Sequence, residues 1–195
     1  MERYVIEIIA VPEVELPERL LWQTLESLRG EWPSAFTGAK AGRTQLNDPA
    51  LHAMIFSLVV DGQLASHLSV PRKTIVHHGG SYKAYGLSGV LTVPAFRGNG
   101  YGERTVRAAI EFMEQDGADI GLFTSDPSLR TYYERCGWTL LEGASLVGGT
   151  RARPFPSDAL GKITFGRFFS ARAQARQSDF LGAAIWLDLR EGDLW

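Results

Sequence analysis

The segment Arg97–Gly102 (Arg-Gly-Asn-Gly-Tyr-Gly) places three glycines within five residues, between a stretch with strand character and a helical pattern. Without a Cβ, Gly98, Gly100 and Gly102 let the backbone turn sharply and approach a ligand closely. A helix that begins here leaves its first N–H groups unpaired and carries partial positive charge. Arg97 adds a guanidinium that can grip an oxyanion through two hydrogen bonds. The sequence therefore predicts a phosphate-binding turn at a helix N-terminus.

Three structures are compatible with glycines at such spacing. A dinucleotide-binding fingerprint would need a third glycine at position 103, where the chain has Glu103, and would follow the first strand of a βαβ unit. A nucleotide-binding P-loop would end in Lys followed by Ser or Thr, but Gly102 is followed by Glu103 and Arg104. A plain glycine-rich turn that begins a helix remains the alternative, and the glycines alone do not decide between it and a phosphate site.

The chain before this turn predicts mainly strands. Two sharp-turn signals, Asp61-Gly62 and Gly79-Gly80, separate apolar runs rich in β-branched residues, which indicates an antiparallel meander. The expected elements are a strand at 4–10, a helix from Pro17 to Gly30, a loop or broken helix at 31–49, and strands at 51–60, 63–78 and 81–93.

After the turn the apolar period becomes helical, with Val106, Ala109, Ile110 and Met113 on one face and an end near Gly117. The remaining expected elements are a strand at 119–124, a short helix at 127–135, a strand at 138–147, a loop with a terminal strand at 148–166, a polar helix or turn at 171–180 and a strand at 183–189. The fold class is therefore mixed α/β, and no linker-like segment divides residues 1–195, so we expect a single domain.

Composition excludes several classes of function. The 20 basic and 22 acidic residues give a formal net charge of -2, so we expect no nucleic-acid partner. Cys136 is the single cysteine, which rules out an internal disulfide and fits a cytoplasmic protein. Residues 1–9 do not resemble a secretory leader, and no run of about 18 apolar residues predicts a membrane span.

Two motifs resemble those of the GNAT superfamily of N-acetyltransferases. Pro94-x-x-Arg97-Gly-x-Gly-x-Gly102 resembles the family's coenzyme A motif, Arg/Gln-x-x-Gly-x-Gly/Ala. The run Tyr132–Trp138 resembles its Tyr-x-x-x-Gly-Phe/Trp signature, in the family's order and spacing. The resemblance implies the GNAT fold: an antiparallel meander, then helix, strand, helix and strand, around a splayed central strand. It also implies acetyl-CoA as co-substrate.

The same resemblance implies roles for particular residues. Tyr133 occupies the position of the general acid that protonates the leaving thiolate. Tyr132 precedes it by one residue, so on a helix its side chain is expected to point in a different direction. Cys136 within this run is expected to fill the core. The residues expected to bind the coenzyme are Val90, Leu91, Thr92, Arg97, Gly98, Asn99, Gly100, Tyr101 and Gly102.

Within the superfamily the chain resembles a divergent aminoglycoside 2′-N-acetyltransferase, through Arg72–Ile75 and above all through the tail Arg190–Trp195. In that family the tail brings an Asp and the terminal Trp carboxylate to a cationic sugar, which implies substrate contacts for Asp193 and Trp195. A family glutamate that helps to deprotonate the amine is replaced by Ser88, whose hydroxyl is no base near neutral pH. Ser88, Asp193 and Trp195 are the expected substrate-binding residues, and the alternative for the tail is a strand anchored by a buried tryptophan.

We therefore expect an acetyl-CoA-dependent N-acetyltransferase acting on a small amine, of aminoglycoside-like character. The general base stays open among His67, Asp193 and the Trp195 carboxylate, acting through water; His77 and His78 lie at a turn and are expected to be solvated. Two alternatives remain: an acetyltransferase for peptide or protein N-termini, and a non-catalytic acetyl-CoA-binding protein. The only partners foreseen are the small-molecule amine and, in a homodimer, a second copy of the chain. No metal is expected, because Cys, His and carboxylate residues do not cluster in the sequence.

Overall fold

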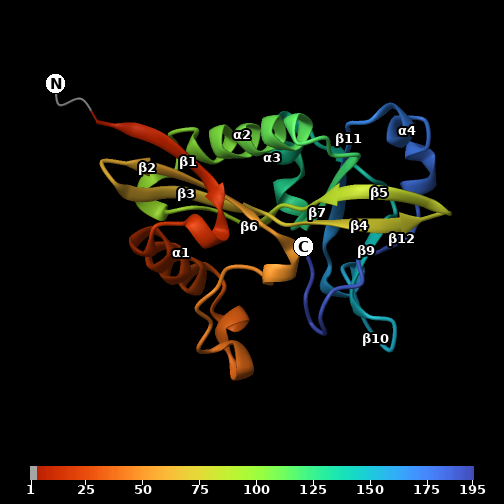
Figure 1. Ribbon diagram of the computed structural model, residues 1–195, viewed down its shortest axis with the longest axis horizontal. Coiled ribbons are helices and arrows are strands. Elements are labelled where there is room, and N and C mark those ends of the chain that lie inside the picture. Colours follow the sequence, from red (N-terminus) through yellow and green to blue (C-terminus); the bar gives the residue numbers. More distant parts are fainter. Residues whose placement is uncertain (1–3) are drawn as a thin grey trace. The chain divides into compact units, whose positions relative to one another are not determined.

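A computed structural model describes residues 4–195, apart from the side chain of Ala39 (Figure 1). Met1–Arg3, the start of the segment tested for a secretory leader, lie outside the described residues. By their internal contacts the residues group into two compact units. The first comprises Met1–Pro71 and Ser88–Ile110, and the second comprises Arg72–Leu87 and Glu111–Trp195. The single domain expected over 1–195 stays a prediction.

The first unit is built on an antiparallel sheet of four strands in the order β1-β2-β3-β6. The strands are β1 (Ile6–Pro12), β2 (Met54–Val60), β3 (Gln63–Val70) and β6 (Ser88–Thr92). Asp61 and Gly62 join β2 to β3 with φ of 48° and 76°. Positive φ at both central residues is the conformation of a type I′ hairpin turn, so the turn predicted from Asp-Gly is confirmed.

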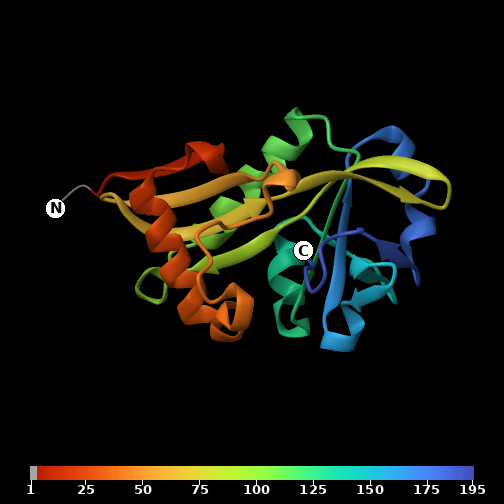
Figure 2. The same ribbon diagram turned by 60° about the horizontal axis from the view of Figure 1, so that its bottom comes forward.

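Helix α1 (Glu18–Glu31) covers one face of this sheet, and Figure 2 shows it running across the strands. Along β2, Ile55 and Val59 pack with the α1 leucines, whereas Leu58 and Val60 pack on the opposite face with Phe96 and Tyr101. The alternation follows from the period of two in a strand. The short 3₁₀ helices of the unit are η1 (Glu13–Glu15), η2 (Pro33–Phe36), η3 (Gly38–Lys40), η4 (Pro49–Leu51) and η5 (Pro94–Phe96). The segment 31–49 is therefore the broken, loop-like stretch that was predicted.

The second unit holds a mixed five-stranded sheet, ordered β4-β5-β7-β11-β8, and a three-stranded sheet, ordered β10-β9-β12. The pair β5–β7 is parallel, as is β9–β12, and the other pairs are antiparallel. The mixed α/β class is thus confirmed. The strands are β4 (Arg72–His77), β5 (Gly80–Tyr85), β7 (Ile120–Ser125), β8 (Thr139–Leu140), β9 (Ser145–Thr150), β10 (Arg153–Pro156), β11 (Ile163–Phe168) and β12 (Ala184–Trp186).

Helix α2 (Tyr101–Gln115) begins in the first unit and ends in the second. Its apolar face, predicted from the helical period, is buried: Val106, Ala109 and Met113 are fully enclosed. The other helices of the second unit are short: α3 (Arg130–Arg135), α4 (Ala171–Gln174), η6 (Pro127–Leu129), η7 (Asp158–Leu160) and η8 (Gln177–Phe180).

Three strands were predicted between residue 51 and the glycine turn, and two of these predictions are wrong because each covers two separate strands. The run 63–78 divides into β3 and β4 at Pro71, because proline has no N–H to donate to a ladder. The run 81–93 divides into β5 and β6, with Gly86 and Leu87 between them. Here the chain changes partners: β5 pairs with β4 and β7, whereas β6 pairs with β3 and lies at the edge of its sheet.

The strand predicted over 138–147 is also two elements. β8 pairs with β11, whereas β9 pairs with β10 and β12 in the other sheet. A turn separates them: Ala144 N donates to Leu141 O at 3.0 Å, and Gly143 has φ of 69°. Trp138 and Leu140 before the turn keep the same period of two as Ala144 and Leu146 after it, which is why the pattern was interpreted as one strand.

The expectation that His77 is solvated is wrong, because its side chain is buried. Its Nε2 lies 2.8 Å from the main-chain oxygen of Asp179, and its ring packs 4.4 Å from that of Phe180. Only His78, stacked on His77, is exposed as expected. The contact comes from a segment about 100 residues later in the chain, which no local pattern could reveal.

Candidate active site

The predicted turn lies between η5 and the first residue of α2. Gly98 and Gly100 have φ of 85° and 74°, the left-handed region that glycine adopts at little cost. A Cβ built on either residue would meet no atom within 4 Å. The glycines therefore face open space at a helix N-terminus, where unpaired N–H groups and the helix dipole favour an anion. These residues fit a pyrophosphate.

The side chains of the turn are ordered by contacts within the first unit. Arg97 Nε donates to Thr92 O at 3.0 Å, and its Nη2 donates to Glu31 Oε2 at 2.8 Å. Asn99 Nδ2 donates to Phe96 O at 3.1 Å, which closes the turn on itself. Sequence reasoning missed Glu31, which it placed only in a loop. No signal in the sequence joins it to Arg97, 66 residues later.

Strand β6 carries the predicted contacts Val90, Leu91 and Thr92. Its register with β3 shifts between His67 and Ser69, so that Leu91 faces His67 but Ser88 faces Ser69, and Gly89 has φ of 60°. Between these two pairs β6 has two residues, Gly89 and Val90, where β3 has one, Leu68, which is the geometry of a bulge. Such a bulge turns backbone N–H groups out of the ladder, where they can polarise a carbonyl or bind an extended ligand.

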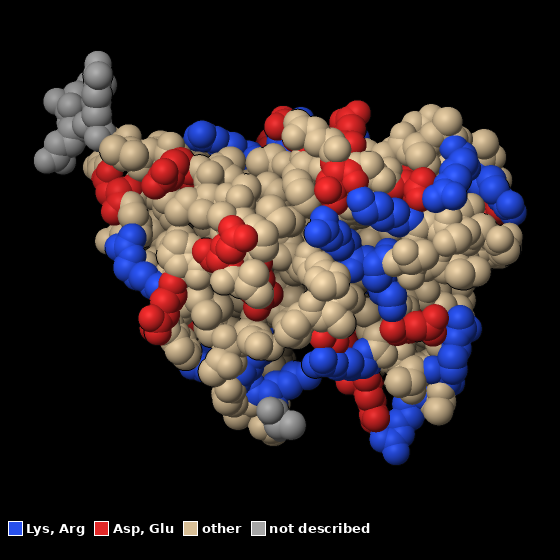
Figure 3. All heavy atoms as spheres, in the orientation of Figure 1, with Lys and Arg blue, Asp and Glu red and all other residues tan. Residues whose placement is uncertain are grey.

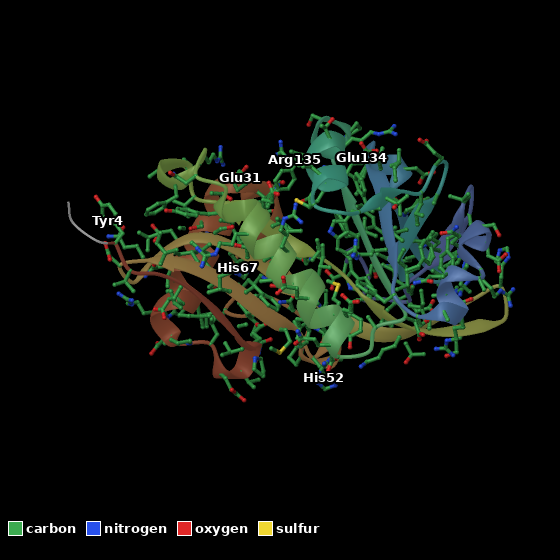
Figure 4. All side chains as sticks on the ribbon, turned by 90° about the horizontal axis from the view of Figure 1, so that it is seen from above. Tyr4, Glu31, His52, His67, Glu134 and Arg135 are labelled. Carbon is green, nitrogen blue, oxygen red and sulfur yellow. The ribbon has the colours of Figure 1, made fainter. Side chains whose placement is uncertain are left out.

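His67, one of the candidate bases, is fully buried in β3, and Figure 4 labels it on the sheet. Burial lowers the pKa of its imidazole from 6.5 to about 3. Its Nε2 lies 3.4 Å from Ser69 Oγ, and its ring would be 3.9 Å from a Cβ on Gly89. An imidazole with so low a pKa is a weak base. Its burial and its low pKa together favour a packing role behind β6 over a role as general base.

Tyr133, in α3 of the second unit, is buried with 4% of its surface exposed. Its ring packs at 4.6 Å from Phe123 and at 5.4 Å from Phe165, which fixes its position. Burial raises the pKa of its phenol well above 10. Tyr132 is only half buried, as expected for a residue one position off. Cys136, 2% exposed, fills the core as predicted.

The tail of the second unit is anchored along its length. Trp195 is buried, and one of its main-chain oxygens accepts from Thr124 Oγ1 at 2.9 Å. Asp193 O accepts from Gly149 N at 3.1 Å, and Arg153 Nη1 lies 2.7 Å from Glu191 Oε1. The structure therefore contains the buried, anchoring tryptophan that the alternative interpretation of the tail predicted. A role for Asp193 or Trp195 toward a substrate stays a prediction.

Within residues 4–195, no three His, Cys, Asp or Glu side chains gather in a way that could hold a metal ion. None of the helices in this part of the chain is long and apolar enough to cross a membrane. On the face drawn in Figure 3, basic and acidic side chains are interspersed.

Comparison with known proteins identifies the family. Residues 31–141 match the family model described as the acetyltransferase (GNAT) domain, and this match contains both the glycine turn and Tyr133. The chain belongs to the GNAT acetyltransferases. The superfamily resemblance inferred from the two motifs, and with it the enzyme class, is thereby confirmed. Acetyl-CoA is the co-substrate of this family.

Solved structures share the fold at low sequence identity. An acyl-CoA N-acyltransferase from Pseudomonas aeruginosa has a TM-score of 0.59 at 17% identity, covering 84% of this chain and 99% of that one. An aminoglycoside 6′-N-acetyltransferase complexed with coenzyme A has a TM-score of 0.58 at 13% identity, covering 84% and 98%. A conserved Enterococcus faecalis V583 protein, described as a probable N-acyltransferase, has a TM-score of 0.54 at 15% identity and covers 73% of this chain. The chain spans only a third, 33%, of the length of that protein.

No curated protein sequence matches the chain. The identities to solved structures are too low to carry a substrate across. The specific relationship to 2′-N-acetyltransferases therefore stays a prediction.

Proposed function

We propose that the chain transfers the acetyl group of acetyl-CoA to the amine of a small cationic molecule of aminoglycoside-like character. The observation that carries the proposal is the turn at 97–102, where open space at Gly98 and Gly100 adjoins a helix N-terminus and a guanidinium. Backbone N–H groups from Gly98 to Gly102 and the Arg97 side chain would hold the pyrophosphate. The bulged β6 supplies further N–H groups, near Val90, for the thioester arm.

Acetyl transfer forms a C–N bond, breaks the C–S bond, removes a proton from the amine and delivers one to sulfur. The phenol of Tyr133 is the group proposed to supply the proton to sulfur. Since burial raises its pKa, the phenol keeps that proton throughout the neutral range. A hydroxyl placed at a leaving thiolate can then act as general acid.

The amine must lose a proton before it can attack, because an ammonium has no lone pair. With His67 disfavoured by its low pKa, Asp193 and the Trp195 carboxylate remain the proposed acceptors, acting through water. Two carboxylates would also attract a cationic substrate. Ser88, half buried on β6, is proposed to line the substrate site without acting as a base.

The rival function is a protein that binds acetyl-CoA without turning it over. Ser88 favours it, because the residue that helps to deprotonate the amine in the aminoglycoside enzymes is absent. Retention of a buried phenol at position 133 favours the enzyme, since coenzyme binding alone does not need it.

A panel of acceptors with acetyl-CoA separates the functions. Aminoglycosides, linear polyamines and peptides with free N-termini are offered in turn, while release of free thiol is followed and coenzyme binding is measured by calorimetry. Thiol release with an aminoglycoside or polyamine supports the proposal, and release with peptides alone moves the substrate to protein N-termini. Coenzyme binding without release for any amine indicates the non-catalytic protein.

A further inference from the structure

Glu31, the last residue of α1, forms an ion pair with Arg97, whose guanidinium is proposed to bind the pyrophosphate. Its Oε2 is 2.8 Å from Arg97 Nη2, while Arg97 Nε is held by Thr92 O at 3.0 Å. Figure 4 labels Glu31 at the end of its helix. A carboxylate therefore occupies part of the donor set that an oxyanion would use.

The placement of Glu31 is not explained by the stability of α1. A negative charge at the C-terminal end of a helix opposes the helix dipole, so Glu31 is disfavoured there by its own helix. Its carboxylate pairs with Arg97, far along the chain, and not with a residue of α1. What the contact does achieve is to neutralise the cation of the turn.

The contact is easily displaced. The side chains of Arg97 and Glu31 are 54% and 41% exposed, and exposed ion pairs are weak and screened by salt. A pyrophosphate carries more charge than a carboxylate and can also bind the N–H groups of the turn, which Glu31 does not reach. The two anions are thus unequal competitors for one guanidinium.

We propose that Glu31 is a built-in competitor for Arg97 that weakens the binding of coenzyme A. The inference rests on the proposed function of the turn at 97–102. Weaker binding of the pyrophosphate favours dissociation of coenzyme A after the transfer, and product release limits turnover in many enzymes. The opposite possibility is that Glu31 orients Arg97 for the ligand, in which case its removal would weaken binding.

The test is calorimetric titration of coenzyme A into the full chain and four variants at low and high salt. Glu31→Gln keeps the shape and removes the charge. Glu26→Gln, an exposed acid on the same helix, removes an equal charge as the matched control. Arg97→Gln and the double variant Glu31→Gln/Arg97→Gln show whether the effect passes through the guanidinium. Thermal unfolding verifies that each variant is folded.

Glu31→Gln is expected to tighten binding by about two- to fivefold at low salt, the range of an exposed ion pair, with a smaller gain at high salt. Glu26→Gln should bind as wild type, and the gain should vanish in the Arg97→Gln background. Weaker or unchanged binding in Glu31→Gln, an equal gain in Glu26→Gln, or a gain that persists without Arg97 overturns the inference.

The outcome also separates this inference from the proposed function. If Arg97→Gln weakens coenzyme binding but Glu31→Gln does not tighten it, the competitor role alone is wrong. If Arg97→Gln leaves the affinity unchanged, the coenzyme turn and the competitor role are both wrong.

Discussion

The indole ring of Trp195 lies directly against Gly86. A Cβ built on Gly86 would come within 2.8 Å of the ring atom Cδ2 and within 2.9 Å of Cε3. Gly86 has no positive φ, so its role here is to leave room for the ring. The end of the tail is therefore packed at the point where the chain leaves β5.

Gly86→Ala should destabilise the protein by about 1–3 kcal/mol, the usual cost of overpacking a core. Urea unfolding measures the change. Gly30→Ala is the matched control: it adds the same methyl group where no atom lies within 4 Å, and in a helix it should stabilise by about 0.5–1 kcal/mol. A Gly86→Ala protein as stable as wild type would show that the tail does not pack here in solution.

Gly100→Ala should lower the affinity for coenzyme A by about tenfold or more, or about 1.4 kcal/mol of binding free energy. The added Cβ would enter the space proposed for the pyrophosphate. Gly117→Ala imposes a similar backbone strain, since the two φ values are 74° and 71°, and nothing lies within 4 Å of either Cβ. Calorimetry on both variants separates strain from ligand exclusion. Equal affinities would remove Gly100 from the coenzyme site.

Tyr133→Phe should lower kcat by about 10²–10⁴-fold with little change in coenzyme affinity, because it deletes the hydroxyl of the proposed general acid and keeps the ring. The aromatic contacts with Phe123 and Phe165 are retained. Tyr132→Phe is the control and should keep its rate. Since the raised pKa keeps Tyr133 protonated, the wild-type rate should not fall through ionisation of this phenol between about pH 7 and pH 9. Wild-type turnover in Tyr133→Phe would make Tyr133 a structural residue.

His67 should make the fold sensitive to acid. Burial lowers the pKa of its imidazole from 6.5 to about 3 in the folded protein. Below pH 6.5 the unfolded chain therefore binds a proton at this residue that the folded chain does not bind. Stability therefore falls as the pH drops from 6.5 towards 3, by up to about 1.4 kcal/mol per pH unit from this group. Urea unfolding of wild type and His67→Gln across this window should show a shallower slope in the variant. Equal slopes would contradict a buried, neutral His67.

Asp193→Asn should raise KM for a cationic amine several-fold and leave coenzyme affinity unchanged. The substitution removes one charge but keeps the main-chain bond from Gly149 N to Asp193 O, so the tail should stay in place. Glu191→Gln, which breaks an exposed pair with Arg153, is the control in the same tail. If Asp193→Asn has the wild-type KM for every accepted amine, the aminoglycoside-like substrate should be abandoned.

The sequence alone predicted the features that depend on neighbouring residues. Positive φ at Asp61, Gly62, Gly98 and Gly100 follows from residue type, and so does the hairpin at 61–62. The helical period after the turn placed the buried face of α2. The two motifs were sufficient to identify the family, because their chemistry is carried by short, local runs.

Features that join distant segments needed the tertiary structure. Apolar residues stand on both sides of Gly86 and of Glu142-Gly143, so that a single strand was predicted over 81–93 and another over 138–147. The chain nevertheless changes partners within both stretches, since strand pairing is chosen by contacts that periodicity does not encode. The burial of His77 depends on Asp179 and Phe180, and the neutral state of His67 depends on the layers that enclose it.

The candidate site likewise has some features that the sequence predicted and others that only the tertiary structure revealed. The sequence predicted that Arg97 and the glycines form a turn at a helix N-terminus, and the structure has this turn. Its proposed role in binding an anion follows from φ freedom, the helix dipole and the guanidinium, which all belong to one short segment. Only the tertiary structure decided that Glu31 pairs with Arg97 and that Trp195 packs on Gly86. These contacts join residues more than 60 positions apart, and they form because folding brings together side chains whose charge and shape happen to fit.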